Sequence, residues 1–147
     1  MAAKLDFQGS HELPVDRETV FDYVSNPLND PEWCPLVASC EQINGNGPAP
    51  GAVYRWDQVL GENQSAPMDV TLVAIEPPGW VEWALDNEMM GYRSTMSFEP
   101  TDTGGTRITQ HNQTTVKAAP EEATSELQEQ AAGVMFQQFE NLTNILS

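Results

Sequence analysis

Apolar and polar residues alternate along residues 4–13, so that the leucine and phenylalanine side chains fall on one side of an extended chain. This period of two predicts a half-buried β-strand, and it puts His11 on the buried side. Turn-forming clusters, such as the one at 61–67, separate the segments that follow. Six further strands are predicted, at 37–43, 52–60, 68–75, 80–85, 91–98 and 106–116. Short connections between successive strands predict antiparallel pairing.

Two short helices are predicted between the first two strands. Asp16 is placed to cap a helix that ends before Pro27, because the residue before a proline disfavours the helical conformation. The proline-rich stretch that follows has room for one helical turn. We expect this turn to begin at Pro31, with Asp30 as its cap and Trp33 as its apolar anchor.

After Pro120 the spacing of apolar residues changes to that of a helix. One long amphipathic helix is predicted, beginning near Glu121 and running almost to Ser147, with Met135 and Phe139 on its buried face. A helix of about 25 residues is roughly 35 to 40 Å long. It is therefore long enough to cross the whole sheet.

Several motifs stand out along the chain: ELPVDRETVFDYVSNP at 12–27, EW at 32–33, PGAVYRW at 50–56, AIEPP at 74–78 and SFEPTDTGGTRIT at 97–109. The order of elements resembles the START-like or SRPBCC superfamily, and these motifs resemble its polyketide cyclase/dehydrase branch. The resemblance implies an α+β helix-grip fold, shared with pollen-allergen-like proteins. In that fold a curved, seven-stranded antiparallel sheet wraps around the long C-terminal helix, the first strand pairs with the last, and a cavity remains. We expect residues 1–147 to form a single domain of this kind.

Strand alternation predicts which side chains face the cavity. The predicted ligand-binding residues are Tyr54, Trp56 and Gln58, then Tyr92, Ser94 and Met96, then Gln110 and Asn112, with Trp33 from the short turn and Met135 and Phe139 from the long helix. Most are apolar or aromatic. The polar minority needs hydrogen-bond partners when buried, and these are either one another or a ligand or water.

His11 is the candidate general acid or base, because histidine changes its protonation state near neutral pH. Tyr92 could donate a hydrogen bond to a carbonyl or enolate oxygen of a substrate. A single histidine on a strand is more often structural, and this alternative stays open for His11. No pair of carboxylates falls on the inward side, so glycosidase-like chemistry is not expected. The sequence also has no GxSxG motif, which argues against a serine nucleophile.

The chain has 22 acidic and 6 basic residues and a formal net charge of -16. Such a surface repels nucleic acids and anionic membranes. It is consistent either with a high-salt cytoplasm or with ordinary solubility. The two histidines and two cysteines, Cys34 and Cys40, lack the spacing of a metal site, so we expect no metal, no cofactor and reduced cysteines. No apolar run is long enough for a signal peptide or a membrane span, so we expect a cytoplasmic monomer or homodimer.

Two classes of function therefore stay open. The first is an enzyme that cyclises or dehydrates a polyketide-like substrate without a metal, using the shape of the cavity and one or two polar groups. The second is a non-catalytic carrier or sensor of a hydrophobic, aromatic or lipid-like ligand. Both classes require an apolar or aromatic small molecule inside the cavity.

Overall fold

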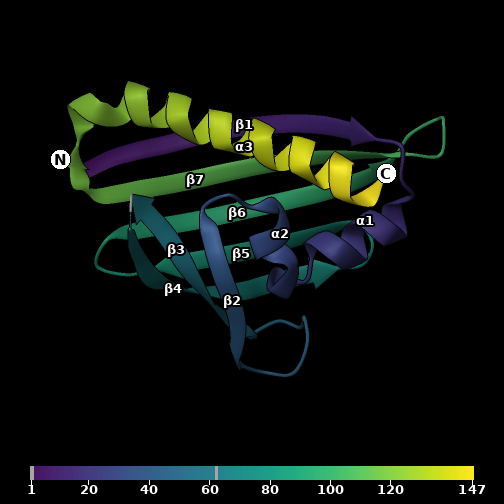
Figure 1. Ribbon diagram of the computed structural model, residues 1–147, viewed down its shortest axis with the longest axis horizontal. Helices are drawn as coiled ribbons and strands as arrows, with labels where there is room; N and C mark the ends of the chain where they lie inside the picture. Colours follow the sequence, from purple (N-terminus) through teal and green to yellow (C-terminus); the bar gives the residue numbers. More distant parts are fainter. Residues whose placement is uncertain (1, 62) are drawn as a thin grey trace.

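A computed structural model describes residues 2–61 and 63–147, and within them seven antiparallel strands form one sheet in the order β1-β7-β6-β5-β4-β3-β2 (Figure 1). The strands are β1 (Ala2–Leu13), β2 (Val37–Asn44), β3 (Val53–Gly61), β4 (Gln64–Glu76), β5 (Trp80–Asp86), β6 (Met90–Pro100) and β7 (Thr106–Pro120). The first strand lies beside the last, as the resemblance implies. The helix-grip fold is confirmed.

Strands β4 and β7 extend furthest beyond the bounds that their sequence patterns indicate. The turn predicted over 61–67 is shorter, because β4 already begins at Gln64 and Pro67 lies opposite Asp57 in the ladder with β3. Strand β7 continues to Pro120, which lies opposite Ala2 of β1 after a register shift that follows the Ala3–Val116 pair. Strand pairing can thus continue where apolar alternation has stopped.

The first helix, α1 (Arg17–Val24), is capped as predicted: the Asp16 carboxylate accepts a hydrogen bond from the backbone N–H of Thr19 at 3.1 Å. A 3-10 helix, η1 (Pro27–Asn29), follows, and the single turn α2 (Asp30–Trp33) comes directly after it.

The prediction that Asp30 caps this turn is wrong. Asp30 is the first residue of α2, and Asn29 precedes it without a side-chain capping bond. The Asp30 carboxyl group points instead to β3, where its Oδ2 accepts a hydrogen bond from Nε1 of Trp56 at 2.9 Å. The Asp30 carboxyl group therefore bonds to a side chain of the sheet and not to the N–H groups at the start of α2.

The long helix α3 (Thr124–Leu146) follows a 3-10 turn, η2 (Glu121–Ala123), so the helical segment begins where the sequence predicts. It lies along β1 on one face of the sheet (Figure 1). Gly9 in β1 allows the close approach, because a Cβ atom there would lie 2.7 Å from Sδ of Met135. The buried residues of α3 are Met135 at its midpoint and Phe139 and Leu142 in its second half.

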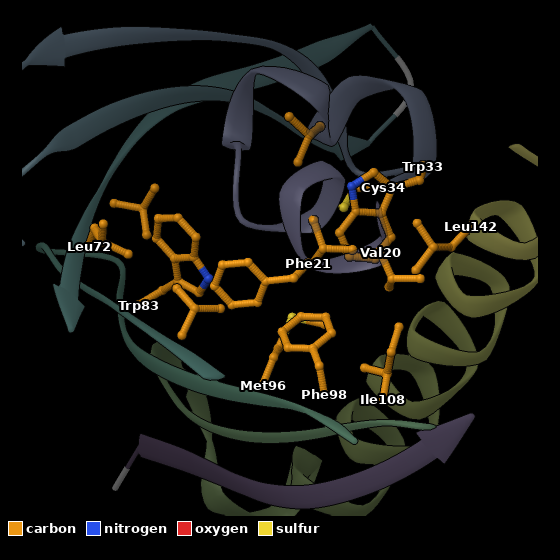
Figure 2. Packing of buried hydrophobic residues seen from close by; sticks show 14 of the residues in the cluster. Val20, Phe21, Trp33, Cys34, Leu72, Trp83, Met96, Phe98, Ile108 and Leu142 are labelled. Carbon is orange, nitrogen blue, oxygen red and sulfur yellow. The ribbon is translucent and has the colours of Figure 1, made fainter. Parts of the chain in front are cut away.

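The hydrophobic core fills the end of the sheet near the C-terminus of α3. Figure 2 shows Phe21 of α1 pointing towards Phe98 of β6, and their rings meet edge to face with centroids 5.1 Å apart. Leu142 of α3 and Ile108 of β7 are fully buried in the same cluster. This core holds α1 and the second half of α3 against the sheet, whereas the first half of α3 covers a cavity.

Candidate functional site

A cavity of about 480 Å³ lies between the first half of α3 and the sheet. Its wall includes Leu127 and Val134 of α3, Phe7 of β1, and the halves of β6 and β7 that lie away from the hydrophobic core. Its volume lies within the usual range of small-molecule sites, roughly 300 to 1,000 Å³. The fold therefore provides an internal space large enough for a ligand.

The wall of the cavity is mostly apolar and aromatic. Three indole rings face it, those of Trp33, Trp56 and Trp83. Methionine side chains, including Met96 and Met135, add flexible and polarisable surface. Such a wall can adjust to an apolar molecule of irregular shape.

Most residues named from strand alternation lie on this wall. They are Trp33, Trp56, Gln58, Tyr92, Ser94, Met96, Gln110, Asn112 and Met135. They come from α2, β3, β6, β7 and α3, so the fold brings together segments that are distant in the sequence.

Tyr54 and Phe139 do not line the cavity, although both lie on the inward side. Tyr54 is fully buried, and its ring meets that of Trp83 edge to face at 6.1 Å. Phe139 belongs to the second half of α3, which packs on the core. Alternation therefore identifies the correct face of the sheet, but it does not tell which end of that face is filled by core.

His11 also lies away from the cavity wall. Its ring stacks on that of Phe139, with centroids 5.4 Å apart and planes 7° apart. Its Nε2 atom lies 2.7 Å from Oγ1 of Thr143. This geometry favours the structural alternative for His11 over the role of general acid or base.

A network of polar side chains lines the cavity on β6 and β7. Nε2 of Gln110 donates to Oγ of Ser94 and to Oδ1 of Asn112, both at 3.2 Å. Oε1 of Gln110 is buried and has no hydrogen-bond partner among the described residues. The polar residues of the wall thus satisfy one another in part, and one buried acceptor remains unpaired.

Asp30 is the polar residue of the cavity wall that the sequence analysis assigned to a helix cap. Its side chain is 6% exposed, and burial raises the pKa of the carboxyl group to about 8, while the hydrogen bond from Trp56 opposes that rise. No local signal in the sequence marks this placement, because an aspartate at the start of a short helix is the usual sign of a cap.

Tyr92 lies on the same wall, and its ring meets the Trp56 ring edge to face with centroids 6.3 Å apart. Burial raises the pKa of Tyr92 to about 12, so its hydroxyl keeps its proton at neutral pH. The hydroxyl can therefore donate a hydrogen bond to a ligand.

The described residues contain no cluster of three or more histidine, cysteine, aspartate or glutamate side chains suited to a metal ion. Cys34 and Cys40 are free thiols. Burial raises the pKa of both, that of Cys40 to about 12, so neither is a reactive thiolate at neutral pH. In the described part of the chain, no helix is long and apolar enough to cross a membrane.

Comparison with known proteins agrees with this geometry. A family model described as polyketide cyclase / dehydrase and lipid transport matches residues 4–146. None of the curated proteins compared with the chain matches its sequence. The family supports binding of a hydrophobic ligand.

Solved structures of the same fold are similar at low sequence identity. A START superfamily protein from Mycobacterium smegmatis has a TM-score of 0.81 at 16% identity, and 96% of each chain is covered. The di-domain ARO/CYC StfQ from the steffimycin biosynthetic pathway has a TM-score of 0.78 at 13% identity, over 98% of this chain and 51% of StfQ. Ara h 8.0201 has a TM-score of 0.66 at 18% identity, over 97% of this chain and 99% of the other.

Proposed function

Because the chain belongs to the polyketide cyclase/dehydrase and lipid transport family, we propose that it binds an apolar or aromatic small molecule, polyketide-like or lipid-like, in the cavity under α3. The observation that carries this proposal is the cavity itself, with its volume of about 480 Å³ and its wall of aromatic and methionine side chains. Transfer of an apolar molecule from water to such a wall is favourable by roughly 25 cal/mol per Å² of buried surface.

A neutral fluorescent dye provides the first test. Nile red fluoresces more strongly in apolar surroundings, and we expect its fluorescence to rise and saturate with the protein. Ala131 lies on the cavity wall, whereas its neighbour Ala132 does not. Ala131→Phe should therefore weaken dye binding because the new ring occupies the cavity, and Ala132→Phe is the matched control. Equal binding by the two variants, or no binding by the unmodified protein, would contradict the proposal.

Native mass spectrometry of the purified protein provides the second test. A ligand carried through purification should appear as an added mass that is lost on denaturation and is absent from Ala131→Phe. Its composition would then identify the class of ligand directly.

We further propose that the protein cyclises or dehydrates its ligand, and the polar side chains on the wall favour this activity. Tyr92 donates to a carbonyl or enolate oxygen, and the cavity holds a flexible chain in the shape that cyclises. The alternative is a carrier or sensor, which requires the cavity alone. A recovered ligand that is lighter than the added one by the mass of one water would indicate dehydration, whereas an unchanged ligand with unchanged connectivity would indicate carriage or sensing.

A further inference from the structure

Asp30 of α2 and Tyr92 of β6 both contact the side chain of Trp56 on the cavity wall. Oδ2 of Asp30 accepts the hydrogen bond from Nε1 of Trp56 at 2.9 Å, and the ring of Tyr92 contacts the same indole edge to face. Asp30 supplies the carboxyl group on the wall among the described residues, and Tyr92 supplies the phenol. Trp56 therefore fixes both polar groups in one part of the cavity.

Each of the two groups keeps its own proton available to a ligand. Hydrogen bonds from the indoles of Trp56 and Trp33 lower the pKa of Asp30 against the effect of burial, and a hydrogen bond from Ser94 does the same for Tyr92. These neighbours donate to the oxygen atoms of the two groups, so the carboxyl proton and the phenol proton are not used by them.

The protonation states make both groups hydrogen-bond donors at neutral pH. Burial raises the pKa of Asp30 to about 8 and that of Tyr92 to about 12, so the carboxyl and the phenol both carry protons. A protonated carboxyl and a phenol in an apolar site form a known kind of oxyanion hole. Two such donors suit one oxygen atom that accepts hydrogen bonds.

The charges around the cavity determine whether a ligand oxygen atom that binds there can be ionised or must be neutral. The described residues of the wall include no lysine, arginine or histidine, and the chain as a whole has a formal net charge of -16. An ionised carboxylate would be buried here without a counterion, which is strongly unfavourable. A neutral oxygen atom avoids this desolvation penalty.

We propose that Asp30 and Tyr92 together bind one neutral acceptor oxygen of the ligand, a ketone or ester carbonyl, and that the cavity rejects ionised carboxylates. This inference rests on the proposed function, because it requires an apolar ligand in the cavity. It adds Asp30 to the site and a carbonyl group to the description of the ligand.

Affinity for a carbonyl ligand should fall as Asp30 ionises. The other titratable groups that face Asp30 are Tyr23 of α1, Cys34 after α2, Cys40 of β2, Tyr54 of β3 and Tyr92 of β6. Burial raises the pKa of each, so all keep their protons up to about pH 9. The residues of α3 that line the cavity are uncharged, and the Glu32 carboxyl group accepts the hydrogen bond from the Tyr23 hydroxyl. Asp30 is thus the group in this region that changes charge between about pH 6.5 and about pH 9.

Three pyrene derivatives of similar size test the inference: acetylpyrene carries a carbonyl, ethylpyrene carries no polar group, and pyrenecarboxylic acid is ionised. Binding is followed by quenching of the tryptophans that line the cavity. At about pH 6.5 we expect acetylpyrene to bind roughly 10-fold more tightly than ethylpyrene, the scale of two net hydrogen bonds, and the acid to bind most weakly. At about pH 9 the advantage of acetylpyrene should fall several-fold, because only Tyr92 still donates, while the affinity for ethylpyrene stays unchanged.

Variants assign this behaviour to the two residues. Asp30→Asn keeps a donor but cannot ionise, so part of the preference for acetylpyrene should remain and its dependence on pH should vanish. Tyr92→Phe should lower the preference several-fold and keep the dependence on pH. Tyr23→Phe, which removes a hydroxyl outside the cavity wall, is the matched control and should change neither.

The outcomes separate the inference from the proposed function. If ethylpyrene binds but acetylpyrene binds no better, if the acid binds as well as acetylpyrene, or if Asp30→Asn keeps the dependence on pH, the inference is overturned and hydrophobic binding stands. If none of the three molecules binds, hydrophobic binding fails and the inference fails with it.

Discussion

Nε2 of His11 lies 2.7 Å from Oγ1 of Thr143, and this hydrogen bond joins β1 to α3. The Thr143 hydroxyl has a single hydrogen, which it donates to the backbone oxygen of Phe139 at 3.1 Å. The His11 ring therefore donates to Thr143, and Nε2 carries the proton. The contact connects the first strand to the last helix beside the core.

His11→Gln should act on stability and not on the ligand. We expect the free energy of unfolding to fall by about 1 kcal/mol, since one hydrogen bond and one ring stack are lost, with ligand affinity and any turnover unchanged. Thr143→Val is the control, because it removes the same hydrogen bond from the other side. A loss of turnover of roughly 10²-fold or more in His11→Gln, measured with a ligand identified by mass spectrometry, would restore His11 as a general acid or base.

The raised pKa of Asp30 predicts the direction in which stability changes with pH. An aspartate in the unfolded chain has a pKa of about 3.9, whereas burial raises that of Asp30 to about 8. Between these values the folded protein holds a proton that the unfolded chain releases, so the contribution of Asp30 to stability is complete below about pH 4 and declines up to about pH 8.

Asp30→Asn removes this titration. In urea unfolding, the unmodified protein should lose stability relative to Asp30→Asn as the pH rises from about 4 to about 8, and the difference should then level off. The other carboxylates titrate equally in both proteins and cancel. A difference that stays constant over this range would show that the carboxyl group titrates normally.

The two halves of α3 should differ in their sensitivity to truncation. Leu142 is fully buried in the core, so Leu142→Ala should lower the free energy of unfolding by about 2 to 5 kcal/mol. Leu127 is only partly buried and lies on the cavity wall, so Leu127→Ala should lower it by less than about 1.5 kcal/mol while weakening ligand binding. Equal losses of stability in chemical denaturation would contradict this division of the helix.

Gly133 offers a substitution that should stabilise the protein. It lies at an exposed position in the interior of α3, and a Cβ atom there would meet nothing within 4 Å. Gly133→Ala should raise the free energy of unfolding by about 0.5 to 1 kcal/mol, because alanine favours the helix. Gly9→Ala is the contrasting variant, since its Cβ would lie 2.7 Å from Sδ of Met135, and it should not stabilise.

Salt should stabilise the protein if its acidity reflects a high-salt environment. The formal net charge of -16 creates repulsion that potassium chloride screens, and the Debye length falls from about 10 Å at 0.1 M to about 3 Å at 1 M. We expect the midpoint of thermal unfolding to rise over this range and to continue rising at higher concentrations. A flat response from dilute to molar salt would leave solubility as the explanation of the acidity.

The helices, the strands and the inward faces of several strands could be predicted from the sequence, because they depend on a local period, whereas the fold followed from the resemblance to the START-like superfamily. Tyr92 and Ser94 follow the same alternation as Met96, and all three line the cavity. The boundary between core and cavity could not be predicted, because it depends on where α1 and the second half of α3 pack. For this reason strand alternation predicts Tyr54 on the cavity wall, whereas its side chain packs in the core.

Asp30 was misassigned for a different reason. Aspartate at the start of a short helix is the ordinary sign of a cap, and nothing local distinguishes it from a buried acid. Its partner, Trp56, lies 26 positions further along the chain, and the contact exists only once α2 packs against β3.

The pairing of β1 with β7 also constrains the order in which the protein can assemble. Ser10 and Thr109, which face each other across this ladder, are 99 positions apart in the chain. During synthesis β1 leaves the ribosome long before the strand that completes it, and its apolar side has no permanent partner until β7 and α3 have followed. Contacts between such distant residues slow folding, and unpaired strand edges promote aggregation. Ribosome-bound chains that end before β7 should therefore depend on chaperones, whereas the completed chain should not.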